Sequence, residues 1–422
     1  MKWLRVGICA LAVFAVAAHG GVEDWARAVI ETGAGLLLLA WAARMYVIRE
    51  EQIVLSPLFP PLAIFSLIVF AQWFFRRTAS SYSTRMELLL LLSDVLLLFL
   101  AAQVFQTLQD WRGFVWFGML FGFLISIFGI LQHLTFNGKL YWFREMHFGG
   151  IPFGPYANRN HFAGFVELIL PLALVPLVLG KVRRERRLVV GVFAVLPIGA
   201  LFLSVSRGGI VSLGVELALL ALVMILRRAR WKQLLAGAAV LLAAMLMVSW
   251  LGVGQLLQRF SSFQSLEVTV GKRASMRRDT WQIFLNHPVI GTGLGTLQIV
   301  YPPYESLYDG KIVNHTHNDY LEALAETGLL GGLCCAWFLG VLLWQSIKRF
   351  RRLNNSFPAA LQLSGLVACS GFLVHSLVDF NLHIPSNALL FFLMAHLATS
   401  EIQQANPQAT SRLHFRPRPN PD

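Results

Sequence analysis

The sequence predicts an all-α, polytopic membrane protein with about 12 transmembrane helices and one large helical periplasmic loop between the ninth and tenth spans. Of the 422 residues, 56% are hydrophobic and only 14% are charged, whereas soluble domains are about half apolar and a quarter charged. Apolar stretches of roughly 20 residues, long enough to cross the hydrocarbon core as helices, recur along the whole chain. We therefore expect a single transmembrane domain over residues 1–400.

Each expected span is an apolar run bounded by polar or basic residues. The runs cover residues 4–20, 29–48, 56–75, 87–106, 113–134, 161–180, 188–205, 209–226, 233–251, 328–346, 358–378 and 384–400. The first run follows Lys2 and Arg5 and could be a signal peptide, but a retained span gives the more consistent charge distribution.

The positive charges indicate the orientation. A net charge of +13 in a soluble protein would suggest nucleic-acid binding. Here Lys and Arg cluster in short loops, as expected for cytoplasmic loops, so we expect no nucleic-acid partner. With both termini in the cytoplasm, the strongest clusters, at 181–187, 227–232 and 348–352, all fall inside. The polar, Pro-rich tail, 401–422, is expected to be disordered and cytoplasmic.

Two outer segments depart from this pattern. Arg76, Arg77 and Arg85 lie at a short outer loop, where they could contact lipid headgroups or form an electropositive rim for an anionic lipid; a wrong span count would also explain them. Residues 252–327 form the one long hydrophilic segment, and the amphipathic pattern around Trp281 predicts a folded periplasmic loop.

The first candidate site is the tight turn Ser206-Arg207-Gly208-Gly209. An arginine at the membrane edge costs free energy unless it is paired or solvated. The two glycines would let the backbone approach a ligand closely. Arg207 is therefore either an anion-binding residue or an arginine that snorkels to the headgroups.

The second candidate is the basic run from Lys272 to Arg278, which we expect to open the amphipathic helix. Arginines at a helix N-terminus oppose the helix dipole, and a bound anion would remove that conflict. Arg277 and Arg278 suit phosphate oxygens because a guanidinium group donates two parallel hydrogen bonds. A solvated charged face is the alternative.

The third candidate precedes the tenth span and contains His315, His317, Asn318 and Tyr320. A histidine beside the membrane surface can accept a proton from a sugar hydroxyl at neutral pH, although an ordinary interfacial histidine is the alternative. Alternate residues diverge on a helix and no further ligands are apparent, so we expect no metal at His315 and His317.

A fourth group lies at the outer end of the eleventh span and consists of His375, Asp379, Asn381 and His383. His375 and Asp379 are four residues apart, so one helix face would carry both. Polar groups at this depth indicate either function or paired structure. The four cysteines all lie in apolar runs without metal-site spacing, and we interpret them as core residues.

Together these motifs resemble the O-antigen ligase and polymerase superfamily of bacterial envelope glycosyltransferases. Each motif is short, but their order, spacing and shared outer position make the combination specific. They are Asn158 to Ala163, Ser206 to Gly209, Arg277 four residues before Trp281, Pro288 with Gly291 to Gly295, and His317 to Leu321 with Glu326 and Gly328. Residues 1–150 resemble the family only as hydrophobic spans.

The resemblance implies transfer of a glycan from undecaprenyl pyrophosphate to an acceptor hydroxyl at the periplasmic face of the bacterial inner membrane. Arg207 and Arg277 would hold the pyrophosphate, and His317 would activate or orient the acceptor. Further substrate-binding candidates are Arg278, Asn160, Asn318, Tyr320, His315, His375 and Asp379. We expect no metal or other cofactor, because pyrophosphate is a good leaving group and fixed guanidinium groups stabilise its developing charge.

The acceptor stays open at this point. A ligase would use lipid A-core, a polymerase would use a growing glycan on the carrier lipid, and related enzymes use protein Ser or Thr. A single compact outer loop joined directly to the His317 motif favours a ligase. A transporter of lipid-linked glycan is the alternative of a different class, but the sequence has neither the broken spans nor the repeated halves expected of one. A structural subunit would leave the outward arginines without a role.

Overall fold

The computed structural model describes residues 1–48, 52–145, 151–228, 231–261, 263–308, 310–352 and 356–403, without the side chains of 252–270. Within these ranges the chain forms helices and no strands, which confirms the predicted all-α class. The α-helices are α1 Lys2–Ala17, α2 Asp24–Val47, α3 Phe59–Phe74, α4 Ser81–Val104, α5 Leu108–Leu134, α6 Arg159–Ile169, α7 Pro171–Val178, α8 Arg187–Ser204, α9 Arg207–Leu226, α10 Trp231–Ser261, α11 Phe263–Asn286, α12 Leu297–Val300, α13 Asp319–Arg352, α14 Phe357–His375 and α15 Pro385–Thr399. Short 3-10 turns are η1 Arg184–Arg186, η2 Pro302–Tyr304 and η3 Asn381–His383.

Every predicted apolar run overlaps a helix. In the part of the chain that the structure describes, nine helical segments are long and apolar enough to cross a membrane, with α6 and α7 together making one of them. The apolar helices α3 and α15 are shorter, and α1 has 16 residues. These helices support a multi-pass membrane protein.

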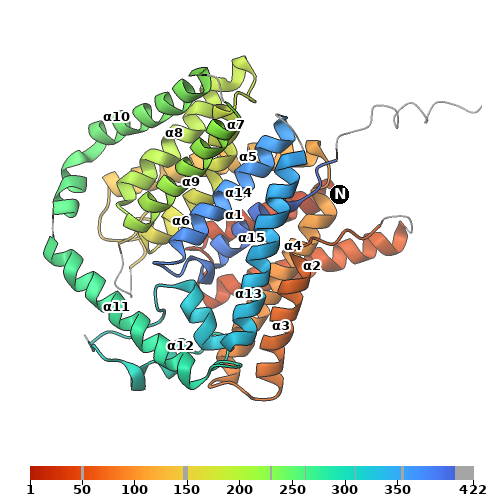
Figure 1. The fold of residues 1–422 in the computed structure, drawn as a ribbon, viewed down its shortest axis with the longest axis vertical. Coiled ribbons are helices and arrows are strands. Elements are labelled where there is room, and N and C mark those ends of the chain that lie inside the picture. Colours follow the sequence, from red (N-terminus) through yellow and green to blue (C-terminus); the bar gives the residue numbers. More distant parts are fainter. Residues whose placement is uncertain are drawn as a thin grey trace, which may run out of the picture.

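The interior of the bundle is formed by α6, α7, α14 and α15. In the α6–α7 segment 94% of the residues in the apolar stretch are buried inside the protein, compared with 11% in α2 and 17% in α10. Figure 1 shows α14 and α15 in the middle of the molecule, while α2 projects from one side. The core helices are therefore those whose ends carry the polar candidates, and α2 and α10 have apolar surface for lipid.

The segment predicted as one large loop is mostly helical. The helix α10 continues past the ninth predicted span to Ser261, and α11 follows it around the outside of the bundle (Figure 1). The prediction that the basic run opens this helix is wrong, because α11 begins at Phe263 and the run starts only at Lys272. A single glycine at Gly271 weakens a helix but does not end it. The dipole argument for an anion at these arginines therefore does not apply.

The glycine-rich segment after α11 packs against α13. Gly291, Gly293 and Gly295 all have positive φ (70°, 107° and 76°), and a side chain on Gly291 would collide with the backbone of Glu326. The carboxylate of Glu326 accepts hydrogen bonds from the amides of Gly295 (2.9 Å) and Leu297 (2.8 Å). The glycines are thus needed for close backbone packing at the start of α13.

The α3–α4 turn, which carries Arg76 and Arg77, lies at the same end of the bundle. The amide of Ala79 donates to the carbonyl of Thr292 (2.7 Å), and the Gln72 side chain donates to the carbonyl of Glu326 (2.8 Å). We call this end, which includes the start of α13, the site end.

The basic clusters lie at the opposite end. The Arg227 side chain at the end of α9 donates to the carbonyl of Phe350 near the end of α13 (3.2 Å), and Arg349 pairs with Glu401 (3.0 Å). Gln403 exchanges backbone hydrogen bonds with the α4–α5 turn, at the far end of α4 from Ser81. Residues 401–403 are therefore ordered here, and the rest of the predicted disordered tail, 404–422, lies outside the described residues.

Candidate functional site

Three segments distant in sequence converge on Asp379, a 1% exposed residue between α14 and η3. The Nδ1 atom of His317 lies 3.1 Å from the Oδ1 atom of Asp379, and the side-chain amide of Asn160 donates a hydrogen bond to the Oδ2 atom of Asp379. The Nη2 atom of Arg273 lies 3.8 Å from Oδ2, while Nη1 donates to the carbonyl of Val378 (2.8 Å). Asp379 therefore joins the start of α6, the middle of α11 and the segment before α13.

The His317 ring is positioned by the cap of the following helix. His317 has a φ of 52°, a left-handed conformation that is costly for a non-glycine residue. Asn318 compensates by accepting a hydrogen bond from the amide of Leu321 (3.0 Å) and donating one to the carbonyl of Leu377 (3.1 Å). Asn318, predicted to bind substrate, therefore caps α13 and ties it to the turn that holds Asp379.

The electrostatics of Asp379 favour one tautomer of His317. Burial alone would raise the pKa of Asp379, but the hydrogen bond with His317 and the interactions with the His317, His161 and His375 side chains hold that pKa well below its usual range. A carboxylate in this position accepts a hydrogen bond from Nδ1–H, which leaves Nε2 with its lone pair. The side chain of His317 is 25% exposed, so part of it can be reached by an incoming group.

The Arg207 turn lies beside His375. The hydroxyl of Ser206 accepts a hydrogen bond from the amide of Gly209 (3.2 Å) and caps α9. A Cβ atom on Gly208 would lie 2.5 Å from Nε2 of His375, so glycine is required for α9 to approach α14. The two glycines do allow the close backbone approach that the sequence predicts. The groups that approach them are side chains of neighbouring helices. His375 Nδ1 in turn pairs with the buried Glu167 (2.8 Å).

His375 and Asp379 do not share a helix face as predicted. The helix α14 ends at His375, and the chain turns before Asp379. The amide of Asp379 still donates to the carbonyl of His375 (3.0 Å), so the two residues stay adjacent. The Arg207 turn, His375 and the Asp379 group therefore form one continuous region at the site end.

The two arginines chosen from the basic run differ in their surroundings. Arg278 is exposed and donates to the hydroxyl of Ser306 (3.1 Å). Arg277 is half-buried and lies one helical turn after Arg273, so these two share a face of α11. Among the described residues, no hydrogen bond or ion pair links Arg277 or Arg278 to His317. Sequence reasoning missed Arg273, which its four-residue spacing from Arg277 could have indicated.

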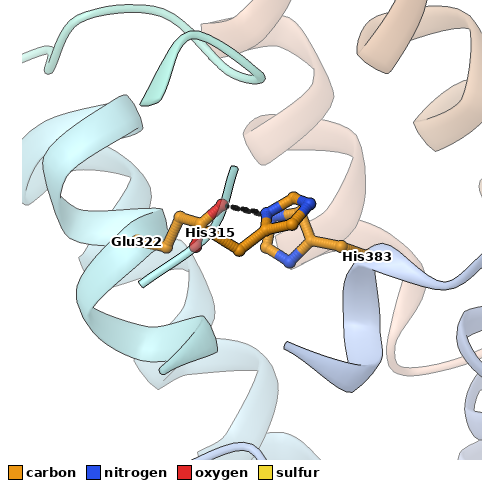
Figure 2. Close-up of side chains that lie close together, drawn as sticks. All are labelled: His315, Glu322 and His383. Atoms are coloured by element: carbon orange, nitrogen blue, oxygen red, sulfur yellow. Dashed lines mark hydrogen bonds and ion pairs between the residues drawn. The ribbon is translucent and has the colours of Figure 1, made fainter. Parts of the chain in front are cut away.

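A second cluster lies next to His317 and involves His315, Glu322 and His383 (Figure 2). His315 Nδ1 is 2.6 Å from Oε1 of Glu322, and His383 Nε2 is 3.3 Å from the same oxygen. His383 Nδ1 lies 2.9 Å from Asp319. The Phe380 ring packs against His315 at a centroid distance of 4.3 Å and against His317 at 5.0 Å, and separates the two clusters.

This second cluster has the spacing of a possible metal site. One ligand atom from each of His315, Glu322 and His383 lies within 4.8 Å of the others. Sequence reasoning found no further ligands for His315 because His383 comes from a different element, η3. Burial would lower the pKa of His383, but Glu322 and Asp319 raise it to about 10. A protonated His383 offsets one of these two negative charges.

Tyr320 has a structural contact in addition to its predicted role. Its hydroxyl donates to the carbonyl of Leu373 in α14 (2.7 Å). Together with the amide of Asp319, which donates to the carbonyl of Ser376 (3.0 Å), this bond fixes the first turn of α13 against α14. Asp319 and Glu322 were not selected from the sequence, although both belong to the motif that contains His317.

One family of known proteins matches part of this chain. The O-antigen ligase family matches residues 192–336, from within α8 to the middle of α13, and this range includes Arg207, Arg277 and His317. No curated protein matches the chain. Residues 192–336 of this chain are therefore similar to the O-antigen ligase family.

Proposed function

We propose that the protein is an O-antigen ligase-like glycosyltransferase that moves a glycan from undecaprenyl pyrophosphate to a hydroxyl of lipid A-core, at the periplasmic face of the bacterial inner membrane. The observation that carries the proposal is the His317–Asp379 pair, at a distance of 3.1 Å, beside the Arg207 turn and the arginine face of α11. The family match to residues 192–336 supports the reaction class.

In the proposed reaction His317 is the general base. Its Nε2 atom takes the proton of the acceptor hydroxyl while that oxygen attacks the anomeric carbon of the donor. The bond between this carbon and the pyrophosphate oxygen breaks, and the lipid pyrophosphate leaves with the electron pair. Asp379 orients the ring and stabilises the imidazolium that forms. Proton transfer by a positioned histidine contributes about 10²–10⁴-fold to the rate.

Arg207 and Arg277 are proposed to bind the pyrophosphate. The leaving oxygen gains negative charge in the transition state, so fixed guanidinium groups stabilise that state more than the ground state. Arg273 is committed to Asp379 and to the carbonyl of Val378, so we assign it a positioning role that holds α11 against the site. The reaction as proposed is independent of a metal cofactor.

The charge distribution supports the assignment of sides. Arg227 and Arg349 belong to basic clusters near the end of the bundle that carries the C-terminal residues. The region around His317 is at the other end of the same helices. Since cytoplasmic loops are enriched in Lys and Arg, the site end is proposed to be periplasmic.

Reconstitution tests the proposal. Purified protein in detergent is mixed with a polyprenyl-pyrophosphate-linked glycan and lipid A-core, and the glycan is followed by gel shift or mass spectrometry. Transfer to lipid A-core supports the ligase, and loss of transfer in His317→Ala ties it to this site. Translocation of the donor in vesicles without any transfer would instead indicate a transporter.

Within the superfamily the acceptor distinguishes the candidates. A deletion strain that loses the glycan attached to lipopolysaccharide indicates a ligase. A strain that makes only single-repeat products indicates a polymerase, and loss of glycan from protein Ser or Thr indicates a protein glycosyltransferase.

A further inference from the structure

A cavity lies inside the bundle, apart from the His317–Asp379 pair. Its volume is about 470 Å³, and it is bounded by α3, α4, α13 and α15. Most of its wall is apolar, including Leu62, Phe65, Leu90, Leu339 and Phe391. Since α3, α4, α13 and α15 are apolar helices of the membrane domain, the walls suit the hydrocarbon chain of a lipid.

One carboxyl group interrupts this apolar wall. Asp94 on α4 lines the cavity and is only 6% exposed, and no described residue donates a hydrogen bond to it. At a rise of 1.5 Å per residue, Asp94 lies about 20 Å along α4 from Ser81 and about 10 Å deeper than Glu87. A carboxyl buried at such depth without a partner is costly, and ionisable groups inside membranes mark functional sites. Asp94 therefore points to a ligand that brings its own hydrogen-bonding group.

The charges around the cavity exclude a phosphate group as that partner. No Lys or Arg is among the described residues that line it. The lining acids nearer the site end are already paired: Glu87 with Arg27 (2.5 Å), Asp319 with His383 (2.9 Å), and Glu326 with backbone amides. A pyrophosphate would meet the carboxyl of Asp94 and no Lys or Arg among the described lining residues, and a polyprenyl tail has no polar group to offer Asp94.

We propose that this cavity binds one acyl chain of a membrane lipid and that Asp94 hydrogen-bonds to a hydroxyl group carried on that chain. The head of the lipid would then lie near Asp319 and Glu326, two to nine residues along the chain from His317. Identifying this lipid as the acceptor rests on the proposed function, whereas the binding itself does not. The site thus selects the acceptor by its chain as well as by its sugar.

The test uses the full chain in detergent and tetradecanoyl lysolipids with a photoreactive group at the chain end. The hydroxyl is placed on the third, sixth or ninth carbon, or is absent. We expect one hydroxylated chain to compete about tenfold better than the plain chain, with crosslinks to α4 or α13, because a hydrogen bond to a buried carboxyl is strong. Equal competition by all four chains, or crosslinks elsewhere, overturns the proposal.

Four variants separate the chain site from the catalytic site. Asp94→Leu should bind the plain and hydroxylated chains equally, Asp94→Asn should keep part of the preference, and Ala323→Phe should block both by filling the cavity. Size-exclusion chromatography checks that each variant is folded, and the wild-type competition stands even if one of them is not. His317→Ala should lose transfer and retain the preference. In the wild-type protein, a chain preference without any transfer contradicts only the proposed function, and transfer without any chain preference contradicts only the chain site.

Discussion

The Nδ1 atom of His317 lies 3.1 Å from the Oδ1 atom of Asp379, although the two residues are 62 positions apart in the chain. A histidine held through Nδ1 by a buried carboxylate presents Nε2 to a reacting group. This pair is the geometric centre of the proposed site, because Asn160 and Arg273 contact the same carboxylate.

Asp379→Asn should therefore lower the rate of glycan transfer by at least about 100-fold, since the amide can orient the ring wrongly and cannot stabilise an imidazolium. His317→Ala should abolish transfer. Binding of the lipid-linked donor, measured separately by a fluorescent analogue, should persist in both variants. If donor affinity collapses together with transfer, the role of His317 as the base is wrong.

Arg277→Lys should lose most of the transfer activity, because lysine keeps the charge but lacks the planar fork that binds two phosphate oxygens. The neighbouring Arg278 provides a matched control, since it is exposed and bonded to Ser306. Arg278→Lys should keep activity within about twofold, the scale of a weak surface contact. Steady-state transfer assays compare the two, and wild-type rates in Arg277→Lys would remove Arg277 from the site.

Glu326→Gln should destabilise the protein by about 1–3 kcal/mol, because one of the two amides bound by its carboxylate would face an NH₂ group. Glu145→Gln is the control, since Glu145 is 72% exposed and pairs with Lys139 at the surface. Thermal unfolding in detergent measures both variants. Equal midpoints would show that the contact between the glycine-rich segment and α13 does not hold this region together.

The protonated His383 should stabilise the fold in a defined pH range. Its pKa is about 10 in the folded protein, above the ordinary value of 6.5. A raised pKa means that the stabilisation is complete below pH 6.5 and is lost as the pH rises through 10. The difference in melting temperature between wild type and His383→Gln should therefore be largest near pH 6.5 and shrink towards pH 10. A constant difference over this range would contradict the ion pairs with Asp319 and Glu322.

Removal of divalent metals should leave transfer unchanged. The His315–Glu322–His383 cluster is the region where a metal could bind among the described residues, and the protonated His383 already faces Glu322 there. Activity is measured after dialysis against EDTA and after adding back magnesium or zinc. A rate that vanishes with EDTA and returns with a metal would overturn the metal-independent reaction and point to this cluster.

The sequence by itself determined the helical membrane fold and the approximate position of each predicted apolar run. The length and hydropathy of a run are local properties, and a sufficiently long apolar run is stable as a helix in lipid wherever it lies in the chain. The sequence also identified the motifs around Arg207, Arg277 and His317, since their residue types suit a charged leaving group and a proton acceptor.

Only the tertiary structure decided which of these residues meet. The pairing of His317 with Asp379, the choice of Arg273 over Arg277 as the partner of that carboxylate, and the meeting of His315 with His383 all depend on how separate helices pack. Local patterns also misplaced the start of α11 and the end of α14, because a helix continues or stops according to its packing as well as its own sequence. Contacts between distant segments are set by helix packing, which no stretch of a single sequence encodes locally.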